Sequence, residues 1–221
     1  MVSAVFHYLG PSLAVLLFAR LDVLGVAWLR LASAAAVFAC WRRPWRLYPE
    51  LSRDGRRTLL ALSLVLAAMN TAIRLAGQPL GFAFAFANCM LFMLYIVLGH
   101  RVANAGGPGG IDRLGAAMLI AAVAATPWGL GGALPAFGHP VLLFAGAGVG
   151  VCSSVIPYVT DQLAMARLAR ATFSLMLALL PVFAAVTGAV VLRQRPTAQD
   201  AAGFILVALG VAVHQETSER T

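Results

Sequence analysis

A set of polar side chains lies within the long apolar stretches of this sequence, and its chemistry suits binding rather than bond breaking. The set comprises an arginine, two asparagines, two tyrosines, two serines and an aspartate: Arg30, Asn70, Asn88, Tyr95, Ser153, Ser154, Tyr158 and Asp161. Inside a membrane, such groups bind a polar solute or carry a proton. No Ser/His/Asp set, HExxH motif or carboxylate pair accompanies them, so we do not expect an enzyme.

Metal and cofactor chemistry is not indicated either. The cysteines Cys40, Cys89 and Cys152 fall in three separate apolar stretches, without CxxC or His/Cys spacing. This pattern predicts neither a disulfide framework nor a metal site. The glycine-rich NAGGPGGID segment lacks the GK[ST] ending of a phosphate-binding loop. We therefore expect no cofactor and no metal.

The two charged members of the set each have two interpretations. Arg30 either marks a transport pathway or extends its long side chain to the lipid headgroups, and we favour the second. Asp161 either carries a coupling proton or is an interfacial acid near Arg167. At 1.5 Å per residue, from an outer end at residue 140, it lies roughly 31 Å deep. That depth is the inner interface, so we favour the second interpretation here as well.

The uncharged members of the set also have two interpretations each. Asn70 and Asn88 fall near the middle of their apolar stretches. Each either binds substrate or joins two helices by a hydrogen bond. We give the two interpretations equal weight for Asn70, and for Asn88 we favour the hydrogen bond between helices. Tyr95 and Tyr158 either line a cavity or lie in the interfacial aromatic belt.

Prolines indicate where two of the helices depart from regular geometry. Pro157 and Pro181 lie near the middle of apolar stretches, where each removes a backbone N–H and frees the carbonyl four residues earlier. In lipid a freed carbonyl needs a partner within the protein, and Ser153, Ser154 and Tyr158 cluster near the first proline. A kinked, polar helix pair is typical of a transport pathway. Proline and serine are also common in membrane helices that have no such role.

Composition defines the elements that must position these residues. Of the 221 residues, 61% are hydrophobic and 11% charged, against about 25% charged in soluble domains. The sequence therefore predicts an all-α polytopic membrane protein whose main partner is the lipid bilayer. About eight transmembrane helices are expected, at residues 3–19, 22–41, 57–76, 79–102, 113–131, 140–165, 170–192 and 197–214.

Arginines between these stretches predict the orientation. The net charge of +8 comes from arginine without any lysine, a composition that suggests a bacterial source. The densest arginine cluster lies at 42–57, which should be cytoplasmic. Alternating the sides of successive spans from this loop places both termini in the cytoplasm and residues 132–139 outside. We expect the protein to lie in the inner membrane of the cell. Because the arginines serve topology, no nucleic-acid partner is expected.

Several passages resemble a known family. They include HYLGPSLAVLLFA, GVAWLRLASAA, RRPWR and AAMN, then GFAFAFANCMLFMLYIVLGHRV, GVCSSVIPYVTDQLAMARLARATF, LLPVFAAVTGAVVL and GFILVALGVAV. Together they resemble the EamA-domain branch of the drug/metabolite transporter superfamily, and most closely its threonine/homoserine exporters. The resemblance implies two five-helix repeats of opposite topology, with a substrate cavity between them.

The sequence departs from that pattern in its first repeat. Asn70 matches the third family helix, yet PLGFAFAFAN, within ten residues, matches the sixth. The resemblance therefore implies an incomplete first repeat of three helices at 1–77, a five-helix second repeat at 78–215 and a cytoplasmic tail at 216–221.

The function implied is that of a secondary transporter that exports small metabolites, such as the amino acids threonine or homoserine. The alternative is a degenerate, non-transporting member of the same family. A homodimer with its incomplete repeats facing each other is one way to cover the open cavity wall.

Overall fold

The computed structural model describes residues 17–72, 81–104 and 109–177, together with Phe6, Ala14, Leu180, Phe183 and Val186. Within them every regular element is a helix. The long elements are α2 (Val23–Arg42), α3 (Arg53–Ala72), α4 (Gly81–Asn104), α5 (Gly110–Phe137), α6 (Pro140–Gly150), α7 (Ile156–Met165) and α8 (Arg170–Leu177). Two 3-10 turns, η1 (Pro44–Arg46) and η2 (Tyr48–Glu50), follow α2, and a π-helical turn, η4 (Val151–Val155), joins α6 to α7.

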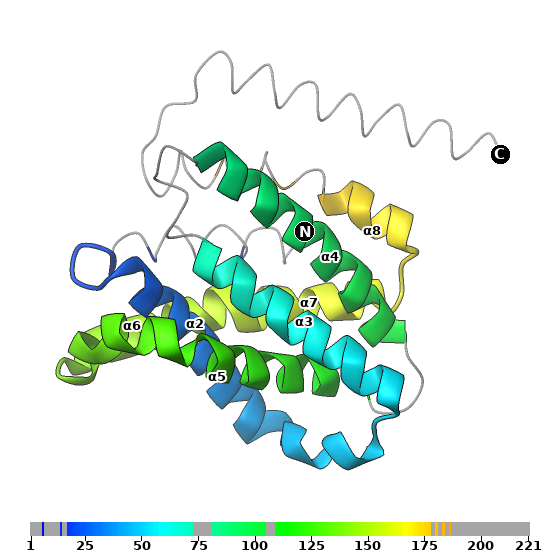
Figure 1. Cartoon of the computed structure of the whole chain (residues 1–221), viewed down its shortest axis with the longest axis horizontal. Coiled ribbons are helices and arrows are strands. Elements are labelled where there is room, and N and C mark those ends of the chain that lie inside the picture. The colour runs from blue at the N-terminus through cyan, green and yellow to red at the C-terminus, as the bar shows by residue number, and fades with distance from the viewer. Residues whose placement is uncertain are drawn as a thin grey trace.

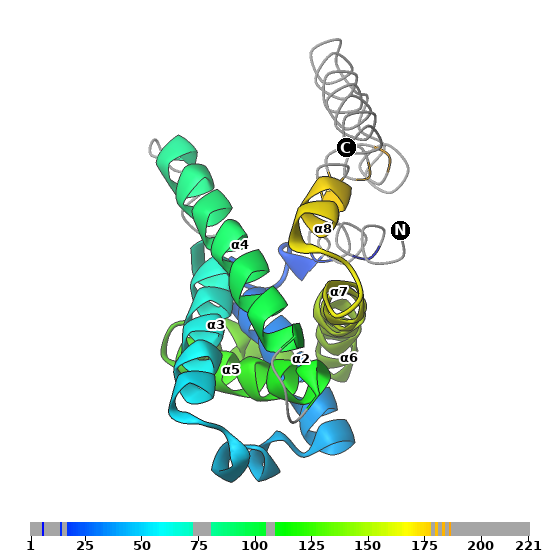
Figure 2. The ribbon, with the colours of Figure 1, turned by 90° about the vertical axis from the view of Figure 1, so that its right-hand side faces the viewer.

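These helices run back and forth between the two ends of one bundle. The links from α4 to α5 and from α7 to α8 lie at the end drawn on the right, the link from α2 to α3 runs along the bottom toward the lower right, and the α5–α6 link lies at the left (Figure 1). Seen from the right-hand end, α3 and α4 form one flank and α6 and α7 the other (Figure 2). The predicted alternation of the chain therefore holds across the described helices.

Five of the eight predicted stretches coincide with helices to within a few residues. Four described segments are long and apolar enough to cross a membrane: Val23–Arg42, Phe86–Asn104, Gly110–Phe137 and Pro140–Met165. The fifth helix, α3, is not among them, and its first turn carries charged residues. The predicted stretch at 197–214, the tail at 216–221 and Pro181 lie outside the described residues. Only Phe6, Ala14 and residues 17–19 of the predicted stretch at 3–19 are described, and only the first part of 170–192 is described as a helix, α8.

The expected outer loop at residues 132–139 is wrong. Helix α5 continues through Pro127 and Pro135 to Phe137, which leaves Gly138 and His139 as the link to α6. Proline does not end a helix in this setting, because neighbouring helices and side chains can satisfy the backbone groups that it frees.

Among the described helices, α2 and α5 make the most extensive contact, and small residues make their close approach possible. A Cβ atom at Gly25 would overlap the backbone of Gly132 in α5. Trp28 donates from its indole Nε1 to Thr126 Oγ1 at 3.0 Å, which fixes the same pair. Between membrane helices, where lipid is as apolar as leucine, such close packing supplies much of the attraction.

Candidate functional site

The π-helical turn η4 is the local consequence of Pro157. In a regular α-helix the proline ring would clash with the carbonyl of Ser153. Here the Ile156 N–H donates to the carbonyl of Val151, five residues back, so the turn before the proline is wider than an α-turn. Such bulges accommodate prolines in helices and often occur at functional sites. The predicted irregularity is thus a π-turn inside an otherwise continuous helix.

Both serines of this turn are buried in the protein. Ser153 Oγ donates to the carbonyl of Val149 at 2.6 Å. Ser154 is 1% exposed, and its hydroxyl has no hydrogen-bond partner among the described residues. The turn packs against α2, where a Cβ at Gly150 would overlap the hydroxyl of Ser33. This close contact brings the serines to the helix that carries Arg30.

Helices α4 and α7 bring together three of the residues singled out in the sequence. The rings of Tyr95 and Tyr158 meet edge to face, with centroids 5.3 Å apart. The hydroxyl of Tyr95 donates to Asp161 Oδ2 at 3.5 Å. All three side chains are buried. The tyrosines therefore line the protein interior and do not belong to an interfacial belt.

Asp161 is enclosed to a degree that the sequence did not indicate. It is 2% exposed, although it lies one turn before the end of α7 at Met165. Arg167, its expected neighbour at the interface, is exposed. The depth expected for Asp161 agrees with the helix end, but the carboxylate lies inside the bundle, beside Tyr95, rather than at the lipid surface.

Arg30 approaches the same residues from α2. Its side chain is partly buried, and the Nε atom is enclosed without a hydrogen-bond partner among the described residues. Tyr158 lies within electrostatic range of both Arg30 and Asp161. An enclosed Nε accords with the pathway interpretation of Arg30, which stays a prediction. Arg30, Tyr95, Tyr158 and Asp161 are called the polar cluster below.

Gln162 is a buried polar residue that the sequence analysis missed. It is 2% exposed, and neither of its side-chain amide atoms has a partner among the described residues. Two glycines make room for it. A Cβ at Gly99 would lie 3.3 Å from its Nε2, and a Cβ at Gly110 would lie 3.2 Å from its Oε1. The available signal was a second polar residue directly after Asp161 within an apolar stretch.

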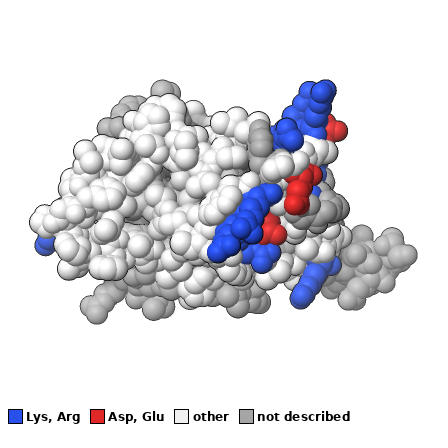
Figure 3. Space-filling model, turned by 90° about the horizontal axis from the view of Figure 1, so that it is seen from below, with Lys and Arg blue, Asp and Glu red and all other residues white. Residues whose placement is uncertain are grey.

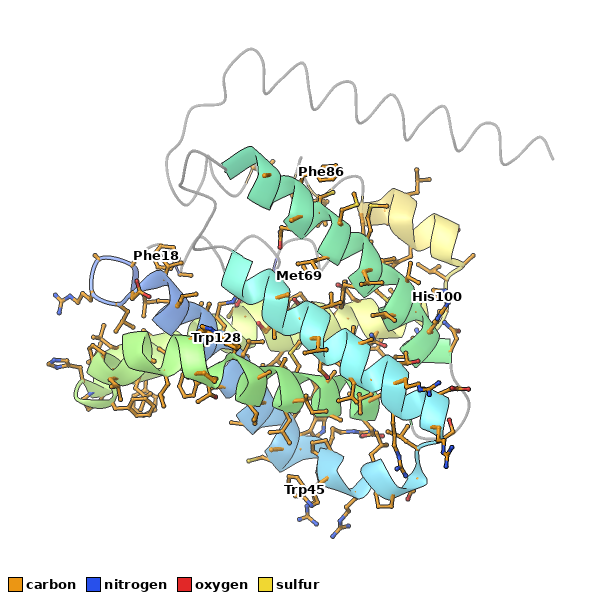
Figure 4. The ribbon with its side chains drawn as sticks, viewed as in Figure 1. Phe18, Trp45, Met69, Phe86, His100 and Trp128 are labelled. Atoms are coloured by element: carbon orange, nitrogen blue, oxygen red, sulfur yellow. The ribbon has the colours of Figure 1, made fainter. Side chains whose placement is uncertain are left out.

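Two side chains of α4 fasten its end to the link between α7 and α8. Asn104 Nδ2 donates to the Met165 carbonyl at 2.9 Å, and His100 Nε2 lies 3.2 Å from the carbonyl of Leu168. Figure 4 shows His100 at this end of the bundle. The contacts close the bundle beyond Gln162.

No contact with the polar cluster is described for the remaining candidates, Asn70, Asn88 and Pro181. Asn88 lies on α4 seven residues before Tyr95, so both are on the same side of the helix. Its Oδ1 is buried without a partner among the described residues. Asn70 belongs to α3, but its side chain, like Pro181, lies outside the described residues.

The arrangement places a cation, an anion and tyrosine hydroxyls in an apolar interior. These groups complement a small zwitterion, whose carboxylate and ammonium need opposite partners. Charged groups inside a membrane protein are expensive to bury and mark solute or proton pathways. Across the described residues, no group of three or more His, Cys, Asp or Glu side chains is placed to hold a metal ion.

Comparison with known proteins shows which family the chain belongs to. Two threonine/homoserine exporters named RhtA are similar to this chain: that of Salmonella typhimurium strain LT2 is 28% identical and that of Escherichia coli strain K12 is 27% identical. Both alignments span 241 positions and cover 85% of this chain and 80% of the relative. No solved structure gives a significant match. The EamA-like transporter family matches residues 79–214, more than half of the chain. The chain therefore belongs to the EamA-like transporter family.

Proposed function

We propose that this multi-pass membrane transporter exports small zwitterionic metabolites, amino acids such as threonine or homoserine among them, through the polar cluster. The observation that carries the proposal is the hydrogen bond from Tyr95 to the buried carboxylate of Asp161, beside the ring of Tyr158. The names of the similar exporters support the same class of solute.

In this proposal each charged group has a counterpart on the solute. Arg30 attracts the carboxylate, and Asp161, which accepts a hydrogen bond from Tyr95, attracts the ammonium group. Burying a charge is costly, so a solute that brings the opposite charge to the site offsets part of that cost. A neutral or singly charged solute would leave one of the two groups without a solute partner.

Efflux measurements test this assignment. Cells that overexpress the protein should tolerate excess threonine or homoserine and hold smaller internal pools of them. Arg30→Gln should lower efflux, whereas Arg20→Gln, which changes an exposed arginine just before α2, should leave it unchanged. Unchanged efflux across a broad amino-acid panel, with the protein shown to be in the membrane, would rule out the proposed function.

Two serines offer a matched pair that separates a pathway role from a structural one. Ser63 and Ser153 are both buried, and each donates to the carbonyl four residues earlier, at 2.7 Å and 2.6 Å. Their alanine variants should therefore lose similar stability. We expect Ser153→Ala to lower efflux more than Ser63→Ala at equal membrane abundance, and equal efflux from the two variants would contradict the pathway role of η4.

The second candidate is a non-transporting family member, and the alignment gap favours it. Because 85% of 221 residues is about 188, about 50 of the 241 aligned positions have no residue of this chain opposite them. That length suits two membrane helices of about 20 residues each. The gap supports a first repeat shortened to three helices at 1–77, followed by the second repeat at 78–215.

Restoring the missing length separates the two candidates. We propose that a homodimer with its incomplete repeats facing each other preserves the cavity wall, and that a monomer is inactive. Two helices of a relative, inserted between Arg74 and Gln78, should then raise efflux strongly if the present chain is inactive. Equal efflux from the shorter and the restored chains, with both monomeric in lipid, would contradict this account of the fold.

A further inference from the structure

We propose that an apolar groove beside η1 binds an acyl chain of an anionic phospholipid, with Arg43 and Arg46 holding the phosphate. The site is separate from the polar cluster and does not depend on the transport proposal. Its lining includes the segment that links α2 to α3, which Figure 1 draws at the bottom of the bundle.

The groove is suited to hydrocarbon. Its volume is about 230 Å³, and its walls are apolar side chains. They come from the segment after α2, from α3 and from α5, and include Pro44, Trp45, Leu47, Leu59, Ala116 and Ile120. Such walls offer almost no hydrogen-bond partner to an amino acid. An acyl chain needs none.

A sharp turn of the backbone shapes this side of the groove. Arg43 has a left-handed backbone conformation, with φ at 47°, and is the one described non-glycine residue with a positive φ. Such a conformation is uncommon for a residue with a side chain. It directs the chain out of α2 and into η1, so that Pro44 and Trp45 form one wall of the groove. Trp45 lies at the lower edge of the bundle (Figure 4).

Two exposed arginines adjoin lining residues of the groove in the chain. Arg43 and Arg46 flank Pro44 and Trp45 in the chain and are exposed, and among the described residues neither guanidinium forms an ion pair. Arg42, by contrast, is held by Asp112. Seen from below, charged side chains gather toward one end of the molecule, and the opposite end is almost free of them (Figure 3).

Charge and groove together select the ligand. Trp45 is 56% exposed although it lines the groove, a position typical of indole rings at the headgroup level. Each arginine near an anionic membrane surface contributes about fivefold in lipid affinity. Arginine also binds phosphate oxygens bidentately. A zwitterionic lipid would fill the groove equally well, but it would gain little from the net positive charge.

The test measures lipid binding to the purified full-length protein, with native mass spectrometry as the readout. Phosphatidylglycerol should bind about 25-fold more tightly than phosphatidylcholine with the same acyl chains. The double variant Arg43→Gln/Arg46→Gln should abolish that preference, and Arg43→Lys/Arg46→Lys should retain most of it. Equal affinity of the unmodified protein for the two lipids would overturn the proposal.

Two further comparisons distinguish a site from general attraction to a basic surface. Arg53→Gln/Arg57→Gln removes the same charge from the same end of the bundle and should change binding less than threefold. Ile120→Trp should fill the groove and weaken the binding of both lipids. If that variant does not fold, Trp45→Ala, which removes one wall, should weaken both instead. Equal losses from the two arginine pairs, or full binding by a folded groove variant, would contradict the proposal.

Discussion

Replacing Gln162 with methionine should stabilise this protein and impair it at the same time. The amide of Gln162 is buried, and both of its polar atoms lack a partner among the described residues. Each buried polar atom left without a hydrogen bond costs about 1–3 kcal/mol. Methionine has nearly the same length and shape, so Gln162→Met should raise the free energy of unfolding by about 2–6 kcal/mol without creating a cavity.

Thermal unfolding in detergent measures the first half of this prediction. For a chain of this size, each kcal/mol corresponds to a shift of about 2–4 °C in Tm. Asn104→Leu is the control, because the amide of Asn104 donates to the carbonyls of His100 and Met165, both at 2.9 Å. That variant should lose about 0.5–1.5 kcal/mol for each bond. The two substitutions therefore remove the same chemical group and should shift Tm in opposite directions.

Efflux assays measure the second part of this prediction, the loss of function. If the amide of Gln162 contacts the solute or the water that accompanies it, Gln162→Met should lower efflux while Tm rises. A fall in Tm would mean that the amide has hydrogen-bond partners and would refute the structural reasoning. A rise in Tm with unchanged efflux would exclude Gln162 from the pathway.

Three further predictions concern packing, charge and orientation. Gly25→Leu should destabilise the fold by several kcal/mol or prevent folding, because its side chain would overlap α5, whereas Gly131→Leu should be tolerated, since a Cβ there meets nothing within 4 Å. Arg42→Gln should cost only about 0.2–1 kcal/mol in a denaturation experiment, because its ion pair is partly exposed. In intact cells, a cysteine at His139 should react with an impermeant reagent and one at Ser52 should not. The reverse pattern would invert the predicted topology.

Much of the fold could be predicted because membrane insertion depends on local composition. Stretches of apolar residues separated by arginines predicted the positions of five described helices, since each span must satisfy its own backbone and be long enough for the bilayer. The exception was the end of α5. Pro135 and several glycines suggested a loop, but the helix continues to Phe137.

The site was predictable only as a set of residues, not as an arrangement. Tyr95, Tyr158 and Asp161 stood out because polar groups are rare in apolar stretches. The sequence did not predict that these side chains meet in the fold, because Tyr95 and Asp161 are separated by 66 positions in the chain. Gln162 was missed because the slot that buries it is formed by glycines on α4 and α5.

The sequence by itself determined that this protein resides in a membrane, how its helices alternate, and where Pro157 interrupts one of them. These properties follow from residue type and spacing within one helix. Only the tertiary structure decided which face of each helix turns inward. A helix that is apolar all round carries no such signal in its pattern. Helix rotation is set instead by contacts such as Gly25 against Gly132 and Tyr95 against Tyr158, and these exist only when the helices pack.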